Sequence, residues 1–128
     1  GSKHGAPWVI GIQDPIEFSN QAITNIVTDS FLAVATSGEY RNYSIDDSGI
    51  ASSHTFDPLT SQSIKNNVLS VTVSSQQSAM LADAWATLLN VMGSESGLEL
   101  AEKHQISVLY IINENNEVRF LKSSHWTH

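Results

Sequence analysis

Leu69-Ser70-Val71-Thr72-Val73-Ser74 alternates apolar and polar residues with the period of two expected for a half-buried strand. The chain then changes period, because apolar residues recur every three or four positions from Met80 to Met92. This spacing predicts an amphipathic helix, and Gly93 supplies its stop. A strand followed closely by a long helix therefore forms the centre of the predicted fold.

Further strands and one more helix are predicted on both sides of this centre. Asp14-Pro15 ends the first strand, and Asp29-Ser30 joins two runs that resemble a hairpin. The predicted strands are Trp8 to Ile12, Ile23 to Thr28 paired with Phe31 to Thr36, Tyr40 to Ile45 paired with Ile50 to Phe56, Ile106 to Ile112, and Glu117 to Leu121. A second helix, capped by Ser94 or Ser96, extends to about His104. The predicted fold class is α+β, mainly an antiparallel sheet packed with two helices.

Size and composition limit the functions that remain possible. The chain has 128 residues, 41% of them apolar, and a mean hydropathy of -0.12, which is compatible with one packed domain over residues 1–128. Its formal net charge of -7 has the wrong sign for a nucleic-acid binder that works through backbone phosphates. The absence of cysteine excludes disulfides, thiolate metal sites and a cysteine nucleophile.

The predicted long helix contains one narrow polar stripe. Asp83, Thr87 and Asn90 are spaced at i, i+4 and i+7, and Asp83 is the only charged residue between Gln77 and Gly93. Carboxylate and hydroxyl oxygens suit Mg²⁺ or Ca²⁺ better than zinc, although two ligands make only half a site. A stripe that simply faces solvent is the equally favoured alternative.

Two other segments carry polar residues that are candidates for a site. His54 and Asp57 lie at a predicted strand end that enters a proline turn, where polar side chains can be held outside the core. Ser37-Gly38 ends another strand with exposed amides, and Arg41 follows where it could hold a phosphate. Taken singly, each segment is better explained by an ordinary turn or hairpin connection than by a site. The remaining histidines show no metal-ligand spacing, and the pair His125 and His128 is expected to be solvated.

Taken in order, these segments resemble the ApbE family of flavin transferases. The pattern of that family, which this chain resembles, has five segments in order. They are Trp-x-Val-Gly-Ile-x-x-Pro, Ala-Thr-Ser-Gly-Asp-Tyr-Arg, His-x-x-Asp-Pro-x-Thr-Gly, a Ser-Val-Thr-Val strand, and an Ala-Asp-(x)3-Thr helix ending near a glycine. The matching segments here are Trp8 to Pro15, Ala35 to Arg41, His54 to Thr60, Ser70 to Val73, and Ala82 to Thr87 with Gly93 beyond.

The resemblance implies Mg²⁺-dependent transfer of FMN from FAD to a Ser or Thr hydroxyl of a target flavoprotein, with release of AMP. It implies Asp83 and Thr87 as metal ligands and His54 as the catalytic residue near the reacting phosphate. Residues implied to bind FAD are Ser37, Gly38, Tyr40, Arg41, Asp57 and Thr60. It also implies a periplasmic protein whose longer parent chain is anchored to the inner membrane by a lipid. The alternative is a non-catalytic flavin- or protein-binding domain that retains the scaffold.

The chain departs from the family pattern in two places and in its extent. Thr60-Ser61 stands where the family has Thr-Gly, and Glu39 replaces Asp. The resemblance covers only the C-terminal part of the family fold, so the half that contributes flavin contacts and a backbone metal ligand is expected to be missing. The chain alone is therefore expected to be inactive.

Overall fold

The computed structural model describes residues 2, 4–15, 21–38, 44–45, 51–52, 67–115 and 117–128. In chain order the described elements are β1 (Trp8–Gln13), β2 (Ala22–Thr28), β3 (Ala33–Gly38), β4 (Ser44–Ile45), β5 (Ala51–Ser52), β6 (Val68–Ser75), α1 (Ala79–Met92), α2 (Ser94–Lys103), β7 (Ser107–Glu114) and β8 (Glu117–Lys122). The predicted α+β class is confirmed, because antiparallel strands pack with two helices. No helix in the described ranges is long and apolar enough to cross a membrane.

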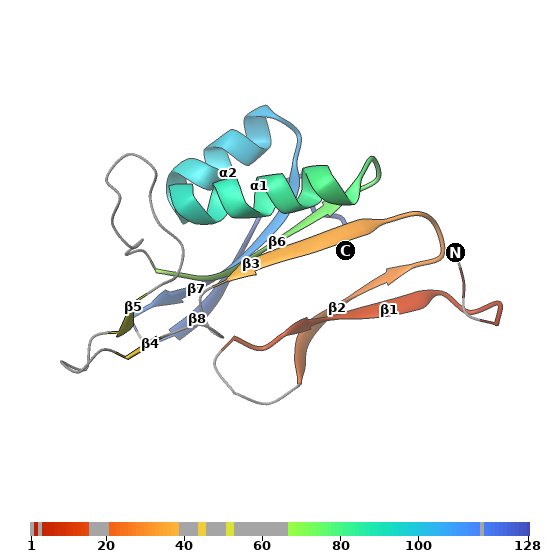
Figure 1. Cartoon of the computed structure of the whole chain (residues 1–128), viewed down its shortest axis with the longest axis horizontal. Coiled ribbons are helices and arrows are strands. Elements are labelled where there is room, and N and C mark those ends of the chain that lie inside the picture. The colour runs from red at the N-terminus through yellow and green to blue at the C-terminus, as the bar shows by residue number, and fades with distance from the viewer. Residues whose placement is uncertain are drawn as a thin grey trace.

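Three layers build the fold. The central layer is an antiparallel sheet in the order β3-β6-β7-β8, with α1 and α2 on one face and the β1–β2 hairpin on the other (Figure 1). Both faces of this sheet are apolar, and each contributes to its own core. Beneath the helices lie Val71, Val73, Val108 and Tyr110, whereas Leu109 and Ile111 face Ile12 and Ile26 of the hairpin.

Strand β6 is buried on both faces, so its predicted half-buried character is wrong. Its polar positions Ser70, Thr72 and Ser74 are at most 7% exposed. Thr72 Oγ1 lies 2.9 Å from Thr36 Oγ1, and Ser74 Oγ lies 2.7 Å from Ser107 Oγ. These hydroxyl pairs between neighbouring strands satisfy polar groups that alternation alone would place in water.

The predicted hairpin across Asp29-Ser30 is also wrong. Both strands exist, but β2 pairs with β1 and β3 pairs with β6. The reason is that β3 presents Ala33 to the helix core and Val34 to the hairpin core, so it requires cover on both faces. The connection at Asp29 therefore crosses between layers rather than closing a two-stranded turn.

The remaining predicted elements agree with the structure where it describes them. The first strand, both helices and the last two strands occur within two residues of their predicted bounds. Strands β4 and β5 pair as Ser44↔Ser52 and Ile45↔Ala51, in the place of the second predicted hairpin. The start of α2 differs from prediction, because Gly93 is its N-cap and no side chain caps it.

Candidate functional site

Helix α1 carries the predicted metal ligands on its outward side. Ser78 Oγ accepts a hydrogen bond from Leu81 N at 3.1 Å and caps the helix, and Gly93 ends it with φ 79°. The residues buried against the rest of the protein are Ala82, Ala86, Leu89 and Asn90. Asp83 and Thr87 are exposed. Asn90 is buried, so the predicted stripe is solvent-facing only along its first two members.

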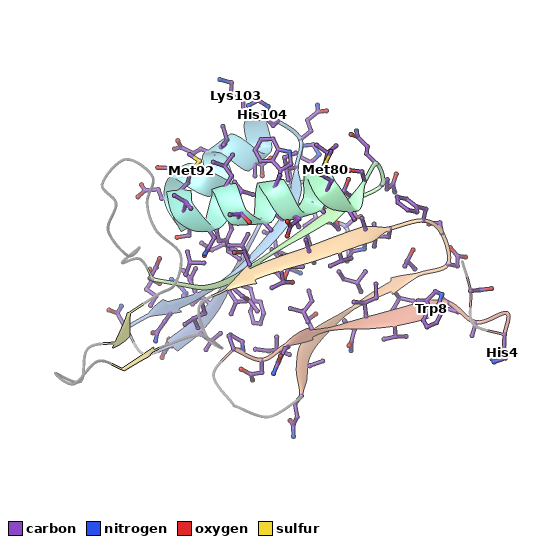
Figure 2. All side chains as sticks on the ribbon, viewed as in Figure 1. His4, Trp8, Met80, Met92, Lys103 and His104 are labelled. Atoms are coloured by element: carbon purple, nitrogen blue, oxygen red, sulfur yellow. The ribbon has the colours of Figure 1, made fainter. Side chains whose placement is uncertain are left out.

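Asp83 and Thr87 are four residues apart, and one helical turn therefore places their oxygens on the same side of α1. Their exposed neighbours on α1 include the apolar residues Met80, Leu88 and Met92; Figure 2 shows the two methionines near opposite ends of the helix. Helix α1 contains no lysine or arginine. Within the described part of the chain, no ion pair involves Asp83. The carboxylate is therefore available to an external cation.

The donor set on α1 fits a hard divalent cation but does not complete its coordination. Mg²⁺ prefers about six oxygen ligands, often with several waters and few carboxylates. Asp83 and Thr87 supply two side-chain oxygens, and the described residues contain no group of three or more His, Cys, Asp or Glu that could hold a metal ion. The remaining ligands must come from water, from substrate or from other parts of a protein.

Ser37 and Gly38 lie at the end of β3, where they pair with Val71 and Ser70 of β6. Ala33 and Ala35 contact the helix-side core, and alternation along the strand places Ser37 on that same face. The end of β6 pairs with Ala33 at the start of β3, and α1 then runs back over the sheet toward the end of β3. The C-terminal half of α1 is therefore nearer to Ser37 than its N-terminal half is (Figure 1). The fold thus brings two predicted site segments, distant in sequence, to one side of the sheet.

The other predicted site residues lie outside the described residues. They are the catalytic candidate His54 and the FAD-binding candidates Tyr40, Arg41, Asp57 and Thr60. The short β4–β5 pair lies between these two groups in sequence. Their roles stay predictions.

A cavity of about 390 Å³ gathers polar residues that sequence reasoning did not connect. Its lining includes His104, His125 and His128, together with Trp85 and Ser74. His128 Nε2 lies 3.1 Å from Ser74 Oγ, and burial lowers the pKa of His128. His128 is exposed, in agreement with the prediction that it is solvated, and its ring also contacts Ser74. No sequence spacing could have revealed the cluster, because β6, α1, the end of α2 and the C-terminal segment together supply it.

Solved structures of flavin transferases share this fold. The flavin transferase ApbE from Vibrio cholerae has a TM-score of 0.77 and 37% identity, covering 98% of this chain and 39% of that protein. The Pseudomonas stutzeri flavinyl transferase ApbE has a TM-score of 0.79 and 35% identity, covering 98% and 38%. At these identities the likeness extends beyond a shared architecture.

Curated relatives and the family comparison point to the same family as the solved structures. A FAD:protein FMN transferase of Vibrio cholerae is 41% identical over 123 residues, which are 96% of this chain and 36% of the relative. The Escherichia coli K12 protein of the same name is 37% identical over 115 residues, which are 90% of this chain and 32% of the relative. The chain therefore spans about a third of these relatives. Residues 1–111 match the ApbE family, and the chain belongs to that family.

Proposed function

We propose that this chain contributes to the Mg²⁺-dependent transfer of FMN from FAD to a Ser or Thr hydroxyl of a target flavoprotein. The observation that carries the proposal is the pair Asp83 and Thr87, which are exposed one turn apart on α1 of an ApbE-family fold. The relatives named FAD:protein FMN transferase support flavin transfer in general. Magnesium as the metal rests on the chemistry of the two oxygen donors.

The proposed reaction is a phosphoryl-type transfer in which one bond replaces another. The acceptor oxygen bonds to the phosphorus of the FMN portion, while the bond from that phosphorus to the AMP oxygen breaks. The hydroxyl proton must leave the acceptor, and His54 is the proposed base. A bound divalent cation would neutralise charge on the pyrophosphate. The contribution of this chain is to hold that cation through Asp83 and Thr87 and to position the hydroxyl.

The remaining candidates have proposed roles in binding FAD. Ser37 and Gly38, on the helix side at the end of β3, are proposed to approach phosphate or ribose through backbone and hydroxyl groups. Tyr40 and Arg41 follow in sequence, and Arg41 is proposed to pair with phosphate. Asp57 and Thr60 are proposed to bind FAD as well.

A chimera tests the proposal, because the chain spans about a third of its relatives. Residues 1–128 replace the matching segment of the Vibrio cholerae relative, and the product is supplied with FAD, Mg²⁺ and an acceptor flavoprotein. Mass spectrometry should detect covalently attached FMN. Asp83→Asn should reduce transfer at least about 100-fold, because it keeps the side-chain volume but removes the charge that holds the cation.

The control for this test is Asp29→Asn, which removes an exposed carboxylate from the β2–β3 connection. That variant should transfer FMN like the parent chimera. Normal transfer by Asp83→Asn would eliminate Asp83 as a metal ligand. A folded chimera that binds FAD but never transfers FMN would instead favour the non-catalytic binding function.

A further inference from the structure

A groove runs between α2 and β8 on the helix-covered face of the sheet, with a volume of about 510 Å³. Its apolar lining consists of Leu98 on α2, Ile112 on β7 and Leu121 on β8. Ile112 is 3% exposed, while the two leucines are half-buried. Helix α2 therefore covers β8 only in part and leaves apolar surface accessible along its length.

Hydrogen bonds at both ends tie α2 to residues that flank the strands of the sheet. At the start of α2, Ser94 Oγ donates to Asn67 Oδ1 at 3.4 Å, and the carbonyl of Asn67 accepts from Asn113 N near the end of β7. At the other end, Ser124 donates from its N and Oγ to the Glu102 carboxylate, each at 2.6 Å. The groove consequently follows β8 toward Ser124.

The α2 side of the groove is strongly acidic. Glu95, Glu99 and Glu102 are exposed at i, i+4 and i+7, which places them on one side of the helix. The two hydrogen bonds from Ser124 lower the pKa of Glu102, so this carboxylate is ionised at neutral pH. The groove's arginine, Arg119, already pairs with Glu114. Glu95 and Glu99 therefore face the groove without a neutralising partner within it, whereas Glu102 is bonded to Ser124 and lies 3.9 Å from His125.

Strand β8 ends the four-stranded sheet, so one of its sides is an open edge among the described strands. Ser123 N donates to Val108 O at 3.1 Å, and N–H directions alternate along an antiparallel strand. The N–H groups of Phe120 and Lys122 must then point away from β7. An exposed edge of this kind is a template for adding another strand.

We propose that this groove and edge bind an extended segment of a partner protein in which basic and apolar residues alternate. Charge complementarity selects the basic residues. Two residues of a strand rise about 6.6–6.8 Å, close to the rise of about 6 Å between Glu95 and Glu99 on α2. Alternate lysines or arginines can therefore meet successive glutamates, with their aliphatic stems on Leu98 and Leu121.

The opposite face of β8 selects the apolar residues. Phe120 pairs with Ile111, whose side chain belongs to the hairpin-side core, so Phe120 lies on the face away from α2. It is nevertheless 43% exposed. A strand added to the edge would place every second side chain beside Phe120, where an apolar residue would cover the ring.

The test uses a fluorescent six-residue peptide of alternating lysine and valine with the 128-residue chain. The alternating peptide should bind more tightly than an isomer with the three lysines together, as measured by anisotropy at low salt. Glu95→Gln and Glu99→Gln should each weaken binding about 2- to 5-fold, the range for single exposed ion pairs. The matched control Asp29→Asn removes one negative charge elsewhere and should leave binding unchanged.

Hydrogen exchange distinguishes strand addition from loose electrostatic attraction. Saturating peptide should slow exchange at the Phe120 and Lys122 amides, which point to the open edge. Equal binding of the two isomers, equal loss in Asp29→Asn, or unprotected amides at both positions would each overturn the proposal. The readout needs neither FAD nor an acceptor protein, so it is independent of flavin transfer.

Discussion

A single buried hydroxyl joins the sheet to the junction of the two helices. Tyr110 is 0% exposed, and its Oη lies 3.0 Å from Leu89 O and 3.2 Å from Gly93 O. Leu89 lies in the last turn of α1, where helical partners run out, and the Gly93 carbonyl also accepts from Gly97 N at the start of α2. Burial raises the pKa of Tyr110 well above its ordinary range, so the hydroxyl stays a donor.

Gly97→Ala should destabilise the protein although alanine normally favours a helix interior by about 1 kcal/mol. A Cβ at Gly97 would lie 1.9 Å from Tyr110 Oη and 3.2 Å from Leu89 O. Overpacking of this kind costs about 1–3 kcal/mol in unfolding free energy, measured by urea denaturation.

A second substitution tests the cause of that loss. Tyr110→Phe removes the oxygen that the new Cβ would strike, so Gly97→Ala should cost less in this background. An equal cost in both backgrounds would show that the hydroxyl contact is not responsible.

Glu102 should make stability depend on pH in the acid range. Its hydrogen bonds from Ser124 lower its pKa below 4.5, and the nearby His125 contributes in the same direction. A carboxyl whose folded pKa is depressed stabilises the fold fully above its unfolded pKa and loses this contribution as pH falls through the folded value. Glu102→Gln should therefore be less stable than the parent at neutral pH, and the difference should shrink as pH falls through the folded pKa of Glu102.

Urea midpoints at several pH values between about 3 and 7 measure this effect. Glu99→Gln is the control, because this neighbouring glutamate is exposed on the same helix and the hydrogen bonds from Ser124 go to Glu102 instead. A stability difference for Glu102→Gln that stays constant across the range would contradict the assignment.

At the scale of elements, the start of α1 depends on one side chain. Ser78 caps the helix, and the first turn contains no acidic residue to offset the helix dipole. Ser78→Ala should lower the unfolding free energy by about 1 kcal/mol, and Ser78→Asp should restore it. Thermal or urea unfolding measures both variants; an alanine variant as stable as the parent would show that the cap is dispensable.

Local sequence patterns predicted the helices and strands of this fold better than they predicted which strands pair with each other. Helix α1 followed from apolar spacing and Gly93, since both signals are contained in the segment itself. The pairing of β3 with β6 could not be predicted from either segment, because it depends on which strands have apolar side chains to bury on both faces of the sheet. The burial of β6 was predicted wrongly for a related reason, because Thr72 and Ser74 are typical of a solvent-facing side until the hydroxyls of neighbouring strands are placed beside them.

The candidate site was predictable to a similar degree. Helical spacing alone predicted that Asp83 and Thr87 share one face of α1, and both are exposed there. The cavity with His104, His125 and His128 was missed, since contacts between elements assemble it. Family resemblance supplied roles that no local pattern could, including that of His54.

At the scale of the whole molecule, we expect the 128-residue chain alone to fold but to bind FAD far more weakly than the Vibrio cholerae relative, of which it covers 36%. Asp83 and Thr87 supply too few oxygens for Mg²⁺, and their helix face is open to solvent. When little of a ligand's surface is buried, the favourable contacts barely exceed the entropy lost on association, so the net binding free energy is small.

Calorimetric titration with FAD and Mg²⁺ measures this affinity, with the Vibrio cholerae relative as the reference. No FMN transfer is expected from the chain alone. An affinity equal to that of the relative would show that these 128 residues contain a complete site.

Strands β3 and β6 are neighbours in the sheet, yet residues 39–67 separate them in sequence. That connection carries His54, Asp57 and Thr60, whereas the strands on either side belong to the two-sided core. The entropy of closing a loop grows only with the logarithm of its length, so doubling the length costs about 0.6 kcal/mol. Insertions between β3 and β6 can therefore reshape the surroundings of the proposed base while the core strands keep their register.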